Sequence, residues 1–578
     1  MTPEKIAPEL MLAFEDYQQE GRSGLALHAR SLGVLPSENI VKPARTVVFI
    51  HCDDQARLDH LAQRGIRINQ AIGRIRTAIL PMDELSTLSD DPAVQRIFPS
   101  RYLRLLMDVA AGKVHVPQFR ASSGLNGQGV IVGVVDSGID PNHPAFAGRI
   151  LRIWDQTLTG PGVPEGGYGA ELTGNLLTLS RDTNGHGTHV AGIASGSDAT
   201  FGGIAPNAEL VIVKSDLQDT QISDAIRYIF RIANGLGRPA VINLSIGGHF
   251  DAHDGSDSLS LIIDSESGPG RIICCAAGNE GNDNIHAQST VLPGTNRMMQ
   301  FRVHSTQLRQ ALLNGWYPGS ASLEVSIRTP GGFVTPWQAV IAAGNPSRRY
   351  NLPDARVTVV TPGPDPANGD HNFIVAMNGA GVGSVLPAGI WQLRVRHASG
   401  TQARVDVWTL DGQQSPQVLF SGTSVRDSMK VGSPGTDAAA ITVASYTTKD
   451  QWRDIDGSLR SVGLALDTIS DFSSEGPLRN GAQKPDVAAP GAMIVSALSA
   501  DSPASRPSMV NSRFVVNAGT SMAAPLVTGI VALLLQRDRN LDPVGVKALL
   551  RAHSSIPGRA AGTFDAKWGF GLIDALGL

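Results

Sequence analysis

Apolar and polar residues follow two different patterns along this chain, and each pattern predicts its own kind of element. From Gly129 to Asn279, apolar runs such as VIVGVVDSG, AELVIVKS, AVINLSIGG and RIICCAAGN alternate with helical stretches such as ISDAIRYIFRIANG. Strands that are apolar throughout and are separated by helices are typical of a parallel sheet in an α/β domain. The same pattern resumes with AAITVASY and ends in two helices.

The second pattern occupies the stretch from about His286 to Phe420. Here short strand-like runs are separated by Gly, Pro and Asn, and helical periodicity is absent; the runs are MMQFRVH, ASLEVSIR, ARVTVV, HNFIVAMNG, GIWQLRVRH and ARVDVWTL. Regularly spaced short strands predict an antiparallel β-sandwich or jelly roll. We therefore expect an inserted domain at residues 286–425, which divides the α/β domain into residues 119–285 and 426–578.

A third region precedes the α/β domain. Between Thr46 and Pro99 the sequence predicts a strand, a helix, two strands, a helix and a strand. This βαββαβ order is typical of a small ferredoxin-like domain. A basic, apolar tail, RYLRLLMD, follows it. We expect residues 1–118 to form this N-terminal segment.

Composition limits the functions to consider. The chain has 578 residues, of which 42% are hydrophobic and 17% charged, so it is long enough for several globular domains. A net charge of -4 gives no reason to expect nucleic acid or an anionic membrane as a partner. Apolar runs such as GIVALLLQ are shorter than the roughly 20 residues of a membrane span.

The first residues show no basic segment followed by an apolar core, so no signal peptide is predicted. This favours a cytoplasmic protein; the alternatives are release by an unrecognised route and a misassigned start. Cysteine usage adds little, since Cys52, Cys274 and Cys275 suggest no disulfide framework. Buried thiols are the favoured interpretation of all three.

Three residues could form a nucleophilic centre. Asp136 ends a predicted parallel strand, His186 precedes a helix in DTNGHGTHVAG, and Ser521 lies in GTSMAAP before a long apolar helix. A serine nucleophile needs a base, and the base needs a carboxylate that fixes its tautomer. Each residue alone could equally be a turn or capping residue. A zinc site at HGTH lacks the usual ligand spacing, and Ala523 stands where the α/β-hydrolase elbow has glycine.

Eight segments decide between these readings. The segments VVDSGID, GHGTHVAGIASG, GIAPNAELVIVK, VINLSIGG, AAGNEG, SSEGP, KPDVAAPG and GTSMAAP resemble, in order, the motifs of the subtilisin-like serine proteases, the subtilases. The resemblance implies a subtilisin-like α/β catalytic domain, an inhibitory propeptide in the ferredoxin-like segment and an inserted jelly-roll-like domain. It covers residues 129–281 and 432–574.

The resemblance also assigns roles. Ser521 becomes the nucleophile, His186 the general base and then acid, Asp136 the orienting carboxylate, and Asn279 the side-chain donor of the oxyanion hole. An extended polypeptide substrate would pair with the backbone near five residues, namely Ser245, Ile246, Gly247, Ala277 and Gly278. The expected activity is that of a serine endopeptidase of broad or apolar preference, with no cofactor needed for the chemistry.

Several alternatives stay open on the sequence. Asp182 could favour a basic substrate residue, or could cap a helix. Ala145 follows His-Pro where many subtilisins place a calcium-binding Asp, so a structural calcium site is in doubt. A pseudoprotease scaffold would need none of the four catalytic residues, and an esterase would use the same triad with another leaving group.

Overall fold

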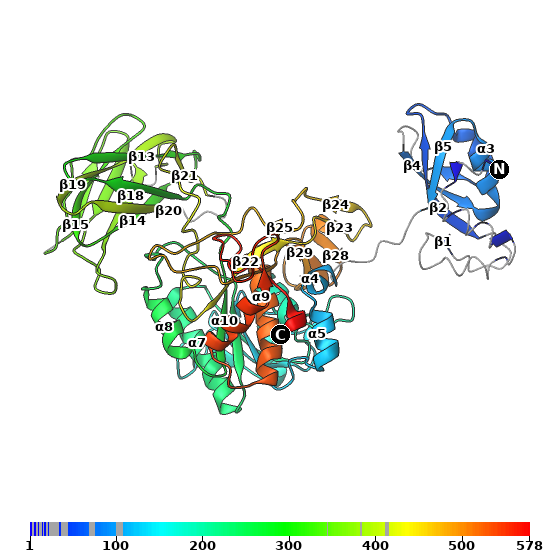
Figure 1. Cartoon of the computed structure of the whole chain (residues 1–578), viewed down its shortest axis with the longest axis horizontal. Helices are drawn as coiled ribbons and strands as arrows, with labels where there is room; N and C mark the ends of the chain where they lie inside the picture. The colour runs from blue at the N-terminus through cyan, green and yellow to red at the C-terminus, as the bar shows by residue number, and fades with distance from the viewer. Residues whose placement is uncertain are drawn as a thin grey trace. The chain divides into compact units, whose positions relative to one another are not determined.

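The computed structural model describes residues 44–68, 75–99, 108–343, 345–381, 384–410 and 416–578, and isolated residues among the first 35. It divides into two compact units, Met1–Leu105 and Leu106–Leu578 (Figure 1). Each is described by itself.

The smaller unit contains an antiparallel sheet with the strand order β3-β4-β2-β5. The elements are β2 (Arg45–Cys52), the 3-10 helix η2 (Asp59–Arg64), β3 (Arg67–Ile68), β4 (Ile75–Pro81), α3 (Leu85–Asp90) and β5 (Val94–Pro99), with the short β1 (Val34–Leu35) beside β2. Apart from a 3-10 first helix, this is the βαββαβ order that the sequence predicts. Alternate residues of β2 and β4, such as Val48, Ile50 and Leu80, pack with Leu85 and Leu88 of α3 in one core. The predicted strand at IRINQAI extends into residues 69–72, which lie outside the described residues.

The larger unit is built on an eleven-stranded sheet. Its centre is parallel, in the order β26-β22-β11-β10-β6-β9-β7. Asn243 of β10 lies opposite Val134 of β6 and Cys274 of β11. The strands are β6 (Ile131–Asp136), β7 (Ile150–Asp155), β8 (Ala170–Leu172), β9 (Glu209–Lys214), β10 (Ala240–Leu244), β11 (Arg271–Ala276), β22 (Ile441–Thr447), β25 (Thr468–Ile469), β26 (Val487–Pro490), β30 (Ser554–Ser555) and β31 (Leu572–Ile573).

Helices cover both faces of this sheet (Figure 1). One face packs against α6 (His186–Ser195) and α9 (Thr520–Arg537), the other against α7 (Asp219–Gly235) and α8 (Ser258–Glu266). Strand residues alternate between the two cores, so the adjacent thiols of Cys274 and Cys275 point to opposite faces of the sheet. All three cysteines are buried and none forms a disulfide.

The larger unit begins earlier than the sequence suggests. The helices α4 (Asp108–Lys113) and α5 (Val116–Ser123) belong to it, and Ala110, Val114, Val116 and Phe119 are buried in the same core as α9. The boundary predicted at residue 118 is therefore wrong. The apolar side chains that follow the basic tail pack on the α/β core.

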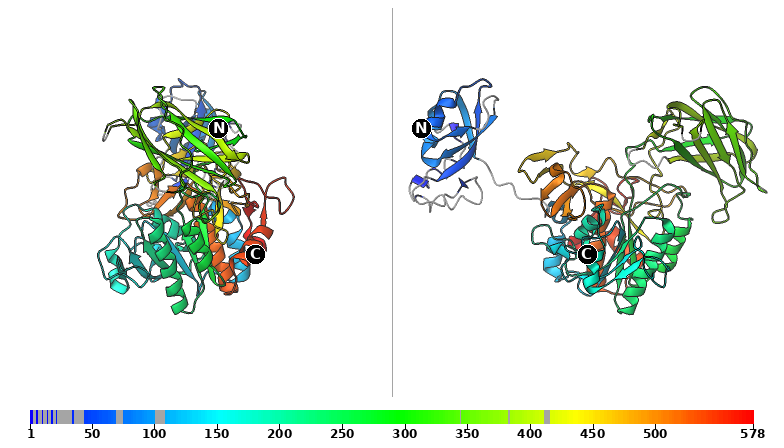
Figure 2. Two further views of the ribbon diagram at one scale, coloured as in Figure 1. Left: turned by 90° about the vertical axis from the view of Figure 1, so that its left-hand side faces the viewer. Right: turned by 180° about the vertical axis from the view of Figure 1, so that it is seen from behind.

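Between β11 and β22 the chain leaves the sheet and forms ten strands over residues His286–Ser421, called the insert below. They make a six-stranded antiparallel sheet, β12-β20-β14-β18-β17-β16, and a four-stranded one, β15-β19-β13-β21 (Figures 1 and 2, green). Apolar side chains of both sheets share one core. The strands are β12 (His286–Val291), β13 (Asn296–Val303), β14 (Gln310–Tyr317), β15 (Ala321–Arg328), β16 (Ser347–Asn351), β17 (Ala355–Val360), β18 (His371–Gly379), β19 (Gly389–Gly400), β20 (Ala403–Leu410) and β21 (Val418–Ser421).

The strand β14 is not among those that the sequence predicts, because its Asn314-Gly315 pair has the composition of a turn. In the structure, Gly315 makes room for an aromatic ring and Asn314 makes hydrogen bonds, and neither lies in a turn. A Cβ at position 315 would lie 2.1 Å from the Phe373 ring, so only glycine fits beneath that ring. The Asn314 amide is buried and donates hydrogen bonds to the loop after β10.

The helix α9 is apolar on all sides. Among the described residues, α9 is a helix long and apolar enough to cross a membrane. However, 89% of its 18-residue apolar stretch is buried inside the protein. Its composition is therefore that of a core helix. Remaining elements of the larger unit are α10 (Pro543–Ala552), β23 (Gln451–Arg453), β24 (Leu459–Ser461), β27 (Ile494–Ala497), β28 (Met509–Asn511) and β29 (Phe514–Asn517).

The corrected boundary can be tested with Phe119, which is 3% exposed. We expect Phe119→Ala to lower the free energy of unfolding of the larger unit by about 3 kcal/mol, because it removes a core side chain and leaves a cavity. Gln118→Ala, on the exposed face of the same helix, is the matched control and should change it by less than about 0.5 kcal/mol. Equal urea unfolding curves for the two variants would contradict the boundary at residue 105.

Candidate active site

Three neighbouring strands end at the same edge of the sheet and carry polar residues there. Asp136 is the last residue of β6, Ser245 follows β10, and Asn279 lies three residues beyond β11. Because β11, β10 and β6 are adjacent and parallel, their carboxyl ends lie together. This edge is where open α/β sheets bind their ligands.

His186 is the first residue of α6 and faces Asp136. Its Nδ1 lies 2.8 Å from Oδ1 and 3.0 Å from Oδ2 of that carboxylate, which is 2% exposed. Burial lowers the pKa of His186, but the Asp136 charge and hydrogen bond outweigh it, so the pKa is raised. The carboxylate therefore holds the proton on Nδ1 and leaves Nε2 for the cleft.

Asp182 caps the same helix. Its buried carboxylate accepts hydrogen bonds from the backbone N–H groups of Gly185 and Thr188, at 2.8 and 2.9 Å, and from the hydroxyls of Ser137 and Thr188. A carboxylate whose oxygens are used in this way fixes the start of α6. Of the two alternatives for Asp182, the structure supports the cap.

Ser521 lies in the first turn of α9, which is held on β10. Pro525 has no N–H to donate to the carbonyl four residues earlier, that of Ser521. The hydroxyl of Ser245 donates to this carbonyl instead, at 2.8 Å. In return the Ser521 hydroxyl donates to the Ser245 carbonyl, at 3.2 Å. Both Ser521 and His186 are described, and no hydrogen bond joins this hydroxyl to the ring in the resting structure.

Asn279 presents a defined donor to the same cleft. Its Oδ1 accepts from the backbone N–H of Thr520, at 2.9 Å, so the Nδ2 amino group is the part of the amide left to donate. The backbone of Gly519 allows this approach, because its φ of +156° is a conformation that residues with a side chain rarely adopt. The N–H of Ser521 is a second donor, since the first turn of a helix has no intrahelical acceptor.

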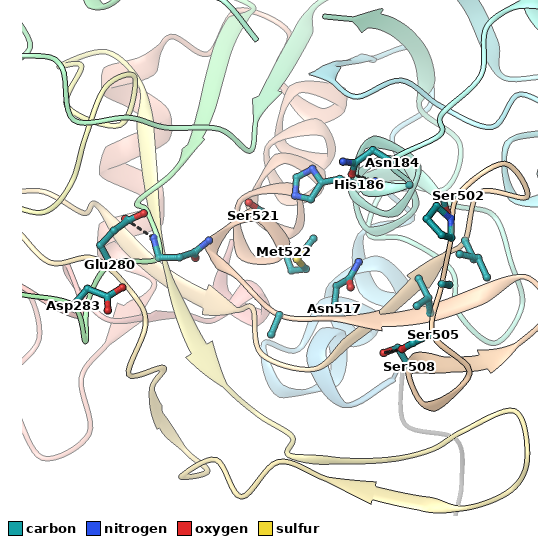
Figure 3. Close-up of a pocket in the computed structure, with 17 residues that line it drawn as sticks. Asn184, His186, Glu280, Asp283, Ser502, Ser505, Ser508, Asn517, Ser521 and Met522 are labelled. Carbon is teal, nitrogen blue, oxygen red and sulfur yellow. Dashed lines mark hydrogen bonds between the residues drawn. The ribbon is translucent and has the colours of Figure 1, made fainter. Parts of the chain in front are cut away.

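These residues line a cleft and a smaller cavity that share lining residues. A cleft of about 670 Å³ is lined by His186, Asn279 and Ser521 together with Ser502, Ser505, Ser508 and Asn517 (Figure 3). A second cavity, of about 160 Å³, shares Asn279 and Ser521 with the first. The five residues predicted to contact substrate all line it, namely Ser245, Ile246, Gly247, Ala277 and Gly278.

The structure adds residues that sequence reasoning missed. Thr520 orients the Asn279 amide, and Glu280 and His249 line the smaller cavity. Thr520 and Glu280 lie inside quoted motifs, so their neighbours could have suggested them. The sequence around His249 contains no motif that would have indicated a role in the site. His189, three residues after His186, is structural: burial lowers its pKa to about 3, and its Nε2 bonds to the carbonyls of Ile494 and Val515.

Ala145 stands where many subtilisins place a calcium-binding Asp, and the described residues around it supply no carboxylate in place of that Asp. The Ala145 side chain has no oxygen, and its carbonyl accepts hydrogen bonds from the Arg149 guanidinium and from Ser197. Across the described ranges, no cluster of three or more His, Cys, Asp or Glu side chains is placed to hold a metal ion.

The electrostatic pairing of Asp136 with His186 predicts a measurable shift in the pKa of His186 when the Asp136 charge is removed. Asp136→Asn should lower the pKa of His186, because burial then acts without the opposing charge. Diethyl pyrocarbonate acylates only neutral imidazole, so the midpoint of His186 modification should move to lower pH in the variant. Peptide mapping by mass spectrometry reads this out, with the exposed His304 as internal reference. An unchanged midpoint would mean that the carboxylate does not govern this ring.

Comparison with known proteins agrees with this geometry. A family model described as the subtilase family matches residues 127–299 and 395–571, more than half of the chain. The serine protease AprX of Bacillus subtilis is 25% identical over 476 residues, which are 81% of this chain and 70% of that protein. Subtilisin E of the same organism is 28% identical over 236 residues, 39% of this chain and 55% of the relative.

A solved structure shares the fold. The CspB protease of Clostridium perfringens aligns with a TM-score of 0.67 and 23% sequence identity, covering 81% of this chain and 97% of that one. The two segments of the family match fall on either side of residues 300–394, which lie within the insert. The chain belongs to the subtilase family and is a serine endopeptidase.

Proposed function

We propose that this endopeptidase hydrolyses polypeptides through the triad Asp136, His186 and Ser521 with an oxyanion hole that includes Asn279. The observation that supports it most is the 2.8 Å contact between Asp136 and His186, in a cleft that Ser521 enters from the start of α9. Three elements distant in sequence contribute one group each, in the roles that acyl transfer requires.

In the first step, the Ser521 hydroxyl rotates from the Ser245 carbonyl toward His186 and loses its proton to Nε2 as Oγ attacks the scissile carbonyl. Asp136 stabilises the imidazolium that forms. His186 then returns the proton to the leaving amine, and an acyl group remains on Ser521. Water, activated by the same imidazole, releases the acyl group.

The oxyanion hole stabilises the tetrahedral intermediate. The Nδ2 group of Asn279 and the backbone N–H of Ser521 converge on the space where the negative oxygen forms. The N-terminus of α9 adds a partial positive charge. These steps use only protein groups and the attacking water, so none of them calls for a cofactor.

Substrate would bind as an extended strand along Ser245–Gly247. Ile246 is half-buried and Gly247 is exposed in the loop after β10, where backbone groups can pair with a peptide. The small cavity beside Ala277 and Gly278 would hold one side chain. Backbone pairing discriminates little between side chains, which favours broad specificity.

The N-terminal unit is proposed to be an intramolecular inhibitor. Its βαββαβ order immediately precedes the catalytic unit in the chain, and tethering would give it an effective concentration in the millimolar range. Its release would need cleavage before α4, because Val114 and Phe119 lie in the catalytic core. The tail RYLRLLMD, proposed to enter the cleft, lies outside the described residues except for Asp108.

The insert is proposed to be a β-sandwich domain with its own core. Its two antiparallel sheets bury a common set of apolar side chains, distinct from the cores on the main sheet.

Two substitutions test the chemistry. Ser521→Ala should abolish peptide hydrolysis, with a loss of roughly a million-fold in turnover, as in the subtilisin case that this magnitude is taken from. Asn279→Ala should lower kcat by roughly a hundred- to a thousand-fold with a smaller change in KM, a range also measured on subtilisin. Near-normal turnover of pure Ser521→Ala would refute the triad, and an effect of Asn279→Ala on KM alone would refute its role as a donor.

Inhibition by the N-terminal unit is tested in two steps. The wild-type chain should lose this unit with time, whereas Ser521→Ala should keep it, and the new N-terminus should lie before Asp108. The isolated N-terminal unit, added to the processed enzyme, should then suppress hydrolysis. Unchanged hydrolysis at saturating concentrations of that unit would show that it has another function.

A further inference from the structure

The half-buried carboxylate of Glu280 supports the turn that carries Asn279. Oε2 of Glu280 accepts a hydrogen bond from the backbone N–H of Asn279, at 2.7 Å, which is the dashed line at Glu280 in Figure 3. The same oxygen accepts from the Ser474 hydroxyl, at 2.9 Å. The position of Asn279 in the oxyanion hole thus depends on where this carboxylate is held.

His249 lies on the other side of the carboxylate. It lies in the loop between β10 and α8, and its side chain is 12% exposed. Its Nε2 is 3.5 Å from Oε2 of Glu280, and its Nδ1 is 2.9 Å from Nε2 of His253. His253 is fully buried, and its own Nδ1 lies 3.2 Å from the carbonyl of Asp251.

The hydrogen-bond partners fix where the protons are. A carbonyl only accepts, so His253 must carry its proton on Nδ1, and burial keeps the pKa of His253 well below its usual range, which leaves the ring neutral. Its Nε2 is therefore an acceptor, and His249 must donate from Nδ1. His249 can then donate to Glu280 from Nε2 only as a cation. A neutral ring would turn a bare nitrogen toward the carboxylate.

The insert holds this pair of rings in place. The His253 ring stacks on Trp408 of β20, with centroids 3.8 Å apart and planes within 3°. The Trp408 Nε1–H donates to the Met429 carbonyl, at 2.8 Å, and its ring stacks on His286 of β12. The Asn314 amide of β14 donates to the carbonyls of His249 and Asp251, both at 3.0 Å.

We propose that His249 is a positioning residue of the oxyanion hole: as a cation, aligned by His253 on the Trp408 ring of the insert, it holds the Glu280 carboxylate against the N–H of Asn279. The inference rests on the proposed function, since it assigns a support to the donor Asn279. It also gives the insert a role in catalysis, because the stack that aligns His253 comes from β20.

The groups around His249 and Glu280 together favour the charged forms of both side chains. Burial opposes the charge on His249, Lys430 repels it, and Glu280 and Asp251 attract it, with the net result that the pKa of His249 is raised. The carboxylate responds to the same contact, since the pKa of Glu280 is lowered to about 2 in spite of burial. Arg479 and His286 lie near His253 and disfavour a charge on that ring.

The test measures kcat and KM of His249→Leu and of the wild type over a range of pH. The concentration of active enzyme in each preparation is determined by titration with a fluorophosphonate. We expect kcat to be about tenfold lower in the variant, a fraction of what loss of an oxyanion donor costs, with KM nearly unchanged. The ratio of wild-type to variant kcat should fall toward one as pH rises, because wild-type His249 loses its proton. Titration of His186 is common to both enzymes and cancels in the ratio.

Three further variants check the link to the insert. His253→Phe keeps the stack but removes the acceptor, and should lower kcat as His249→Leu does; His253→Gln, which can accept through Oε1, should recover part of the rate. Trp408→Leu removes the stack and should also lower kcat. His304→Leu, an exposed histidine of the same insert, is the matched control and should match the wild type.

The outcomes separate the inference from the function on which it rests. A wild type that releases no peptide products would refute the proposed function itself. An active wild type with a ratio of one at every pH, a ratio that does not change with pH, or an effect on KM alone would overturn the role of His249. If His249→Leu does not fold, His249→Gln takes its place, and the expected result is a ratio of wild-type to variant kcat above one at low pH that falls toward one as pH rises.

Discussion

The seating of the first turn of α9 on the ends of β10 and β11 determines the geometry of the whole site. Pro525 leaves the Ser521 carbonyl without an intrahelical donor, and the Ser245 hydroxyl takes that place. An unsatisfied buried carbonyl would cost about 1–3 kcal/mol, so the contact holds the helix in one register on the strand. The Thr520 N–H bonds to Asn279 at the same time. One helix terminus thus positions both the proposed nucleophile and the proposed oxyanion donors.

Most of the catalytic fold can be predicted from the sequence because its signals are local. Fully apolar strands alternate with helices, and Asp136 ends such a strand, which places it at the ligand-binding edge. The boundary at residue 118 fails for the opposite reason. Nothing local shows that Val114 and Phe119 pack on the core of α9, some 400 residues later in the chain. The Asn-Gly pair of β14 likewise resembles a turn until Phe373 is seen above it.

The candidate site likewise has features that the sequence predicts and features that only the folded structure shows. Motifs identify the residue types and their order, and hence the candidate triad, but not the hydrogen bonds that orient them. The direction of the Asn279 amide follows from Thr520, and the role of Asp182 from the four donors around it. The contact of His249 with Glu280 joins a loop after β10 to a turn after β11, and its alignment comes from the insert. Such relations exist only once the chain has folded.

The central claim is that Ser521 is a nucleophile activated by His186. Reaction of the processed enzyme with a fluorophosphonate, followed by peptide mapping, tests it most directly. We predict one phosphonyl group per molecule, on Ser521, with a rate of labelling that rises with pH as His186 becomes neutral. Labelling of another serine, or a rate on Ser521 no greater than that of an exposed surface serine, would contradict the account.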